Sequence, residues 1–268
     1  MFRMALVCLA VTVISLVGLA VDHRDIVGAP AWLKPAKFGI SSAVYLISLA
    51  AMVRDIPSSP AVRRAVAACA VLLTLEVALI AMQAARGTTS HFNIDTLFDA
   101  IVFQSMGLGI GIVWVISAMI LYLHWRTPAV DRSMALALRL GLALNILGAG
   151  VGWRMTTPDR AQITAIQRGE RPRIVGAHSV GGPDGGPGLP ITRWNTQYGD
   201  LRAPHFLGMH ALQLLPLLLL GLRRVRSRTG DQFERTSVIA GAAVSAAVFA
   251  FALAQALAGH PFLPLNAT

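Results

Sequence analysis

Residues 153–210 divide the chain, and they read WRMTTPDRAQITAIQRGERPRIVGAHSVGGPDGGPGLPITRWNTQYGDLRAPHFLGMH. Five apolar stretches precede this segment, a sixth overlaps its end and a seventh follows. Between residues 176 and 190 the segment holds six Gly and three Pro, which exclude helix and strand alike. We therefore expect a long loop, rich in Gly, Pro and Arg, over residues 153–204.

The apolar stretches on either side of this loop indicate a membrane protein. The composition is 55% hydrophobic and 13% charged, with a mean hydropathy of +0.61, whereas a soluble domain is about one quarter charged. A spanning helix needs roughly 20 apolar residues. Seven stretches meet or approach that length: 4–21, 38–53, 65–84, 100–123, 133–152, 205–222 and 237–258. The sequence thus predicts one all-α membrane domain over residues 1–268, a bundle of seven transmembrane helices.

The short loops predict how this bundle is oriented. Residues 54–64, 124–132 and 223–236 each carry at least two arginines, which favour the cytoplasmic side. The N-terminus is then inside and the C-terminus outside. The 153–204 loop lies on the outer, periplasmic side of the cytoplasmic (inner) membrane of a bacterial-type cell. The first stretch also has features of a secretory signal, with a cleavage site at Gly18-Leu19-Ala20, but its long apolar run favours a retained helix.

The formal net charge of +10 comes mainly from arginine. Arginines in membrane-protein loops orient the helices and meet lipid phosphates, so the bilayer is the expected partner and nucleic acid is not. The only two lysines, Lys34 and Lys37, are expected to mark the interface, or else to hold an anionic substrate group. The two cysteines, Cys8 and Cys69, lie within apolar stretches and predict no disulfide framework.

Six of the seven histidines fall on or near the expected outer side, His124 being the exception. His205 and His210 open the sixth helix, and their spacing of five places them about 140° apart around its axis. His210 and Gln213 share one face. Because a histidine inside a membrane helix is a functional candidate, we expect His210 and Gln213 to bind a cofactor.

Two carboxylates are candidates for catalysis. Glu76 lies mid-span in the third stretch, where a carboxylate is costly unless it is paired, neutral or beside a polar cavity. Asp99 opens the fourth stretch, after a polar run that includes Ser90 and His91. Helix capping is the alternative explanation for this run. Ser90 is not expected to be a nucleophile, because a histidine adjacent in sequence does not by that fact point at the serine hydroxyl.

These residues predict a membrane-embedded metal or redox site on the outer side. The expected metal ligands are His91, His178, His205 and His210, for zinc, copper or iron. A zinc-bound water would make the protein a hydrolase with Glu76 as proton acceptor. Alternatively, His210 and His91 would ligate haem b. The glycine-rich part of the loop is expected to act as a lid that places His178 and Asp184 above His205.

Two non-enzymatic functions remain open from the sequence. The first is an accessory or assembly subunit whose outer loop binds a membrane or periplasmic protein. The second is a transporter with Glu76, Arg139, Asn145 and Gln213 along its path, although no internal repeat supports it. The sequence does not decide whether the protein is an enzyme.

Overall fold

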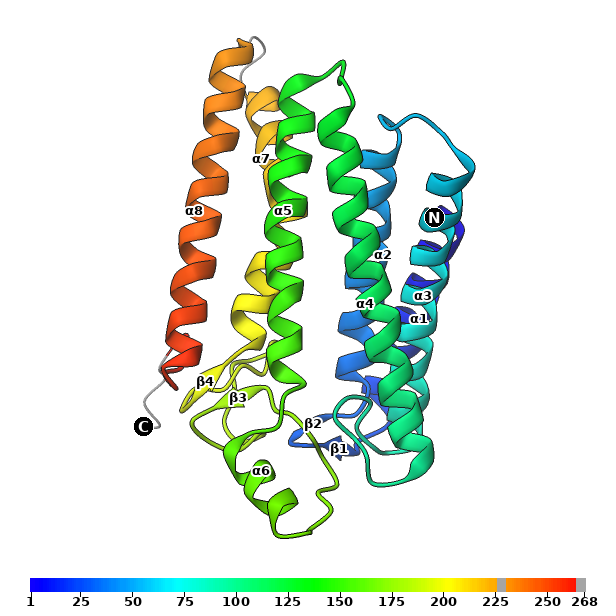
Figure 1. Cartoon of the computed structure of the whole chain (residues 1–268), viewed down its shortest axis with the longest axis vertical. Helices are drawn as coiled ribbons and strands as arrows, with labels where there is room; N and C mark the ends of the chain where they lie inside the picture. The colour runs from blue at the N-terminus through cyan, green and yellow to red at the C-terminus, as the bar shows by residue number, and fades with distance from the viewer. Residues whose placement is uncertain (226–229, 264–268) are drawn as a thin grey trace.

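The computed structural model describes residues 1–225 and 230–263, and these form an antiparallel bundle of long helices (Figure 1). Seven helices in this part of the chain are long and apolar enough to cross a membrane, which confirms the predicted helical bundle. They are α1 (Phe2–Val21), α2 (Leu33–Val53), α3 (Pro60–Ala85), α4 (Leu97–Arg126), α5 (Arg132–Met155), α7 (Arg202–Val225) and α8 (Asp231–Leu257).

Most of these helices are longer than the apolar stretches that predict them. Hydropathy locates the apolar middle of a helix, whereas side-chain caps and turns set its ends. Ser59 accepts a hydrogen bond from the amide of Val62 to start α3, and Thr96 does the same for Asp99 at the start of α4. The helices therefore extend into polar residues that hydropathy leaves outside.

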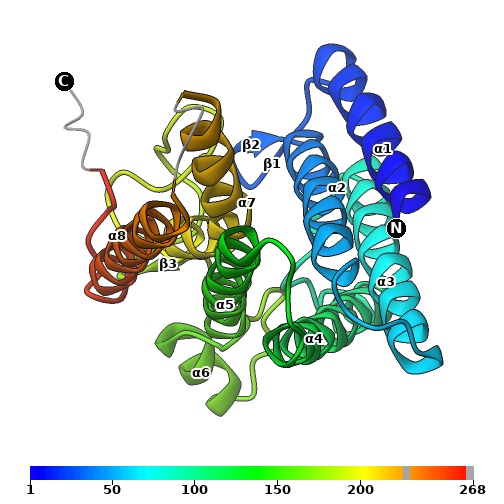
Figure 2. The ribbon, with the colours of Figure 1, turned by 90° about the horizontal axis from the view of Figure 1, so that it is seen from above.

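The bundle has two parts, which Figure 2 shows from above. Helices α1 to α4 form one part, and α5, α7 and α8 form the other. The closest packing in the second part is between α5 and α7, at Gly148 and Gly208. A Cβ atom on Gly148 would lie 2.6 Å from the amide nitrogen of Met209. Small residues of this kind let helix backbones approach within a membrane.

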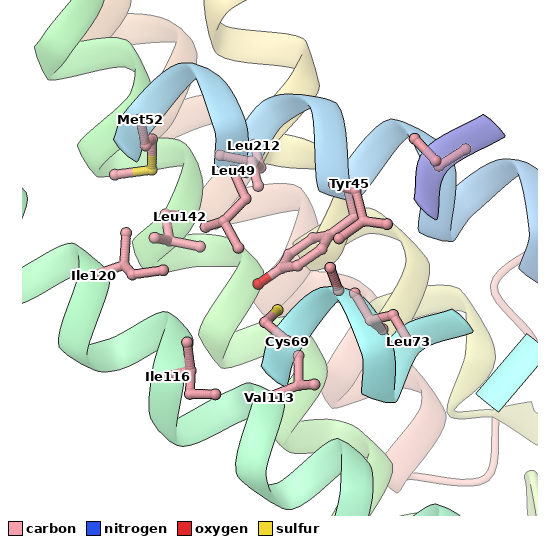
Figure 3. Close-up of a cluster of buried hydrophobic side chains, with 14 of the residues drawn as sticks. Tyr45, Leu49, Met52, Cys69, Leu73, Val113, Ile116, Ile120, Leu142 and Leu212 are labelled. Atoms are coloured by element: carbon pink, nitrogen blue, oxygen red, sulfur yellow. The ribbon is translucent and has the colours of Figure 1, made fainter. Parts of the chain in front are cut away.

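An apolar cluster joins the two parts at the middle of the bundle (Figure 3). Its buried side chains come from α1, α2, α3, α4, α5 and α7, and include Leu49, Cys69, Ile120, Leu142 and Leu212. One polar pair crosses it, where the hydroxyls of Tyr45 and Ser117 lie 2.5 Å apart. The centre of the bundle is thus a packed core.

The expected 153–204 loop is shorter and more regular than predicted. α5 continues to Met155 and α7 begins at Arg202, so the connection between them covers residues 156–201, which we call the cap. It contains the helix α6 (Arg160–Gln167) and the strands β3 (Ser179–Val180) and β4 (Gly199–Asp200), which pair with each other. The expectation that residues 176–190 exclude any strand was wrong for β3, because residues 178–180 lie ahead of the Gly-Pro run and pair with residues distant in sequence.

The cap is attached to both parts of the bundle. The amide of Val175 donates to the carbonyl of Phe92 in the α3–α4 loop, and the amide of Ala177 donates to that of Met155. Arg193 donates to the carbonyl of Gly28, between the strands β1 (Asp25–Ile26) and β2 (Ala29–Pro30). The cap therefore closes one end of the bundle, which we call the capped end (Figure 1).

The opposite end carries arginines, and we call it the arginine-rich end. It includes Arg54, Arg63, Arg126, Arg132 and Arg223, which lie at helix ends remote from the cap. Arg223 pairs there with Asp131 and Glu234, at 2.7 and 2.6 Å. The two ends of the bundle therefore differ in chemistry.

Candidate functional site

Polar side chains from five segments meet under the cap. We call this group the capped-end cluster; its members are Lys34, Glu76, Ser90, His91, His178, Asp184 and His205. His91 interacts electrostatically with Lys34, His178 and His205, and Lys34 interacts with Glu76 and Asp184. Three of the four predicted metal ligands and one of the two predicted catalytic carboxylates therefore lie in one region.

His91 is the centre of the cluster. Its Nδ1 atom lies 3.0 Å from the hydroxyl oxygen of Ser90 and 3.1 Å from Nζ of Lys34. Its Nε2 atom lies 3.4 Å from Oε1 of Glu76. The next residue, Phe92, has a φ of 66°, so the chain turns sharply where the ring is presented. His91 thus joins a hydroxyl and an ammonium group on one side to a carboxylate on the other.

Glu76 comes from α3 and is only 4% exposed. Its Oε1 atom has no hydrogen-bond partner among the described residues, and the closest basic group is the ring of His91. A carboxylate buried at this depth in an apolar helix is costly without a partner. Glu76 is therefore a candidate functional residue.

The surroundings keep the ring of His91 neutral. Burial lowers the pKa of His91 well below its ordinary value of 6.5, and the nearby positive charge of Lys34 lowers it further. A neutral ring that accepts a hydrogen bond at Nδ1 carries its proton on Nε2, facing Glu76. In this tautomer the Nδ1 lone pair faces both the Lys34 ammonium group and the Ser90 hydroxyl, and it is the atom that can act as a base toward Ser90.

The cap contributes His178, which is held by Asp184. Oδ2 of Asp184 lies 2.9 Å from Nδ1 of the ring, and the same carboxylate accepts hydrogen bonds from the amides of His178 and Ser179. Burial raises the pKa of Asp184, but the hydrogen bonds from His178 and from the two amides outweigh it, and the net pKa is lowered. For His178, burial lowers the pKa although Asp184 opposes this, so the ring is neutral with Nε2 unprotonated.

His205 and His210 face different neighbours. Nδ1 of His205 lies 2.8 Å from the carbonyl oxygen of Gly148 on α5, which leaves its Nε2 free. His210 stacks on Phe206 at 3.9 Å between ring centroids, and its Nδ1 bonds the carbonyl of the same residue. Gln213 donates instead to Ser48 on α2. The predicted cofactor residues His210 and Gln213 therefore share no hydrogen-bond partner in the structure.

Asp99, the other predicted catalytic carboxylate, has structural partners. It accepts hydrogen bonds from Gln83 at 2.9 Å, from Arg86 at 2.6 Å and from the hydroxyl of Thr96 at 2.6 Å. Its own amide donates to Thr96 at the start of α4. The N-cap of α4 is Thr96, and not Ser90, Asn93 or Asp95, which were the residues considered for capping; Asp99 lies in the first turn after this N-cap.

The predicted set of four metal ligands is only partly assembled. Across residues 1–225 and 230–263, no three His, Cys, Asp or Glu side chains lie at the spacing that a metal ion needs. His178 and His205 do each have Nδ1 anchored and Nε2 free, the arrangement in which proteins present imidazole to a metal. Each ring is thus held through Nδ1 by a fixed acceptor.

Two members of the cluster were not chosen from the sequence. Ser90 was not expected to be a nucleophile; the structure places its hydroxyl oxygen 3.0 Å from Nδ1 of the adjacent His91. The sequence contained an indication for Lys34, because Lys34 and Lys37 are the chain's only lysines and lie one helical turn apart.

Comparisons with protein-family models, with curated proteins and with solved structures found no significant match to this chain. Function must therefore be inferred from the chemistry of the capped-end cluster.

Proposed function

We propose that this protein is an integral membrane enzyme that crosses the cytoplasmic membrane seven times, with the cap on the outer side. Apolar side chains exposed along the helices support membrane insertion, and Leu6, Ile14, Leu108 and Leu217 are each more than half exposed. The arginines at the end opposite the cap support this orientation.

The proposed chemistry is acyl transfer to water, with Ser90 as nucleophile. His91 takes the proton of the Ser90 hydroxyl at Nδ1 while the serine oxygen attacks the carbonyl carbon of an ester or amide. Glu76 stabilises the imidazolium through Nε2–H. The tetrahedral intermediate then expels the leaving group, which takes the proton from Nδ1. Water attacks the acyl-serine with the same base, releases the acid and restores the hydroxyl.

One observation carries this proposal. The ring of His91 lies between the Ser90 hydroxyl at 3.0 Å and the buried Glu76 carboxylate at 3.4 Å, as nucleophile, base and orienting acid do in hydrolases. Lys34 adds positive charge on the reacting side, where negative charge develops on the substrate oxygen.

The proposal is tested with a fluorophosphonate probe, which reacts with activated serines whatever the natural substrate. The protein in native membranes is labelled and digested, and we expect the modified peptide to contain Ser90. Labelling should disappear in Ser90→Ala. Ser105→Ala is the matched control, because Ser105 is an exposed serine on α4 bonded only to the carbonyl of Ile101. No labelling of the wild type, or equal labelling of Ser90→Ala, contradicts the proposal.

A metal site is the second candidate function, and the anchored rings of His178 and His205 favour it. Zinc, copper or iron bound at their Nε2 atoms would be completed by water or substrate. Elemental analysis of the detergent-purified protein, prepared without an affinity tag that binds metal, tests this. Near-stoichiometric metal that is lost in His205→Gln supports the site, and iron with a Soret band identifies haem. Metal-free, folded wild type rejects it.

A further inference from the structure

The two lysines of the chain point under the cap. Lys34 and Lys37 lie three residues apart in the first turns of α2, and residues with this spacing share a helix face. Nζ of Lys34 lies 3.1 Å from His91, and Nζ of Lys37 donates to the carbonyl of Thr192, in the cap, at 3.3 Å. Both side chains are only partly exposed. A lysine that marks an interface extends its ammonium group into water, and these two do not.

Neither lysine forms an ion pair with a carboxylate among the described residues. The carboxylates nearby are engaged elsewhere: Asp200 pairs with Arg202 at 2.6 Å, and Asp184 pairs with His178 at 2.9 Å. Glu76 faces His91. The lysine ammonium groups are therefore left with neutral hydrogen-bond partners.

Further positive charge surrounds them. Arg202 acts electrostatically on both lysines, Arg193 acts on Lys37, and the two lysines repel each other. Glu76 and Asp184 attract Lys34, and Asp200 attracts Lys37, but none of these carboxylates forms an ion pair with a lysine among the described residues. Partly buried cations of like charge are unfavourable unless an anion joins them. The two ammonium groups thus lack a hydrogen-bonded negative group.

We propose that this group is supplied by the ligand, and that Lys34 and Lys37 bind a phosphate or carboxylate beside the capped-end cluster. Lysine is a compact point charge suited to phosphate. Because Lys34 also contacts His91, an anion on the lysines lies next to the reacting groups. The natural source is either a lipid headgroup or a soluble anion. This inference shares its site with the proposed hydrolase function but does not require Ser90 to react.

The test measures ligand-induced stabilisation of the full chain in a neutral detergent. Thermal unfolding is followed during titration with inorganic phosphate and, separately, with dihexanoyl phosphatidate; dihexanoyl phosphatidylcholine is the control without net charge. We expect a saturable rise in Tm with a phosphate-bearing anion. In Lys37→Gln the apparent affinity should fall about tenfold or more, as loss of a charge-assisted hydrogen bond predicts.

Variants separate this site from general charge effects. Arg54→Gln removes an exposed cation at the arginine-rich end and should leave the affinity unchanged. Lys37→Arg keeps the charge and should retain most binding, which also covers the case in which Lys37→Gln fails to fold. Ser90→Ala should bind normally, so failure of the serine chemistry and failure of the anion site are distinguishable.

Each outcome decides the matter. Stabilisation by phosphatidate alone identifies a lipid headgroup, and stabilisation by free phosphate identifies a soluble anion; in either case its loss in Lys37→Gln supports the site. No stabilisation by either anion overturns the inference. So does equal stabilisation by phosphatidylcholine, or stabilisation that neither lysine substitution alters.

Discussion

The two ends of the bundle contain the same trio of groups in different settings. At the arginine-rich end, Nδ1 of His124 accepts from Nε of Arg139 at 3.0 Å, and Nε2 faces Asp55 at 3.5 Å. At the capped end, the ring of His91 lies between Lys34 and Glu76 in the same order. Each end thus places an imidazole between a cation and a carboxylate.

The further contacts of each trio indicate a structural role at the arginine-rich end and a reactive role at the capped end. Arg139 also donates to the carbonyls of His124 and Thr127, at 2.6 and 2.9 Å, and so completes the end of α4. The Asp55 side chain is 42% exposed and solvated, whereas that of Glu76 is 4% exposed. Arg139 has several acceptors and therefore holds the end of α4. At the capped end, Lys34 and Ser90 lie beside a neutral imidazole, to which a proton can be transferred.

The largest expected effect comes from exchanging each carboxylate for its amide. Glu76→Gln should reduce the rate of fluorophosphonate labelling of Ser90 by about 100-fold or more, because the orienting acid of the base is lost. Asp55→Asn, the matched change at the other end, should leave the rate unaltered. Labelling kinetics on membranes measure both. Equal labelling rates in the wild type and Glu76→Gln would show that the trio at the capped end has only a structural role, like the trio at the arginine-rich end.

Removing the cation of each trio should have the larger effect at the arginine-rich end, and the effect should be on stability. Arg139→Met leaves two backbone carbonyls and a buried imidazole without their donor, and should lower the free energy of unfolding by about 2–3 kcal/mol. For a chain of this size that is a Tm lower by roughly 4–12 °C. Lys34→Met removes one contact and should lower Tm far less. A loss of Tm in Lys34→Met as large as that in Arg139→Met would make the capped end equally structural.

The smallest effect is a pH dependence of stability to which the capped end contributes through two histidines of its loops. The pKa values of His91 and His178 are lowered in the folded protein, so the unfolded chain binds more protons below pH 6.5. Stability is therefore full above that pH and falls as the pH drops below it. Tm measured from pH 7.5 to 5.5 should decrease, and less so in His91→Gln.

The control for this measurement is His23→Gln, because His23 is exposed. It should follow the wild-type pH profile. A wild-type Tm that rises on acidification would show that protonation of these rings stabilises the fold.

Hydropathy was sufficient for the seven helices because apolar length is a local property of the chain. It also singled out Glu76, since a carboxylate within an apolar helix is visible without a structure. The spacing of His205 and His210 predicted that they point in different directions around the helix, but it did not predict their hydrogen-bond partners. His205 bonds the carbonyl of Gly148 on α5, and His210 bonds the carbonyl of Phe206, one turn earlier on α7.

The contacts that make the site depend on tertiary structure. The Ser90–His91 contact depends on the side-chain conformations that the α3–α4 loop imposes, and the residue after it, Phe92, has a left-handed backbone conformation that its type disfavours. The regular part of the cap needs β3 to meet β4 across a Gly- and Pro-rich segment, a pairing set by contacts between distant residues. Composition predicts a loop there without regular structure, and the pairing of β3 with β4 adds a strand that composition does not show.

The contact between Gly148 and Gly208 has a mechanical consequence. Because each glycine lies against the backbone of the other helix, α5 and α7 pack there as one body, and a side chain larger than hydrogen at either position would clash. The cap joins that body at Met155, through Ala177, and joins the other part of the bundle at Phe92, through Val175. A tilt of α5 and α7 would therefore displace the backbone next to His91. The distances within the capped-end cluster would then change with the angle between the two parts of the bundle.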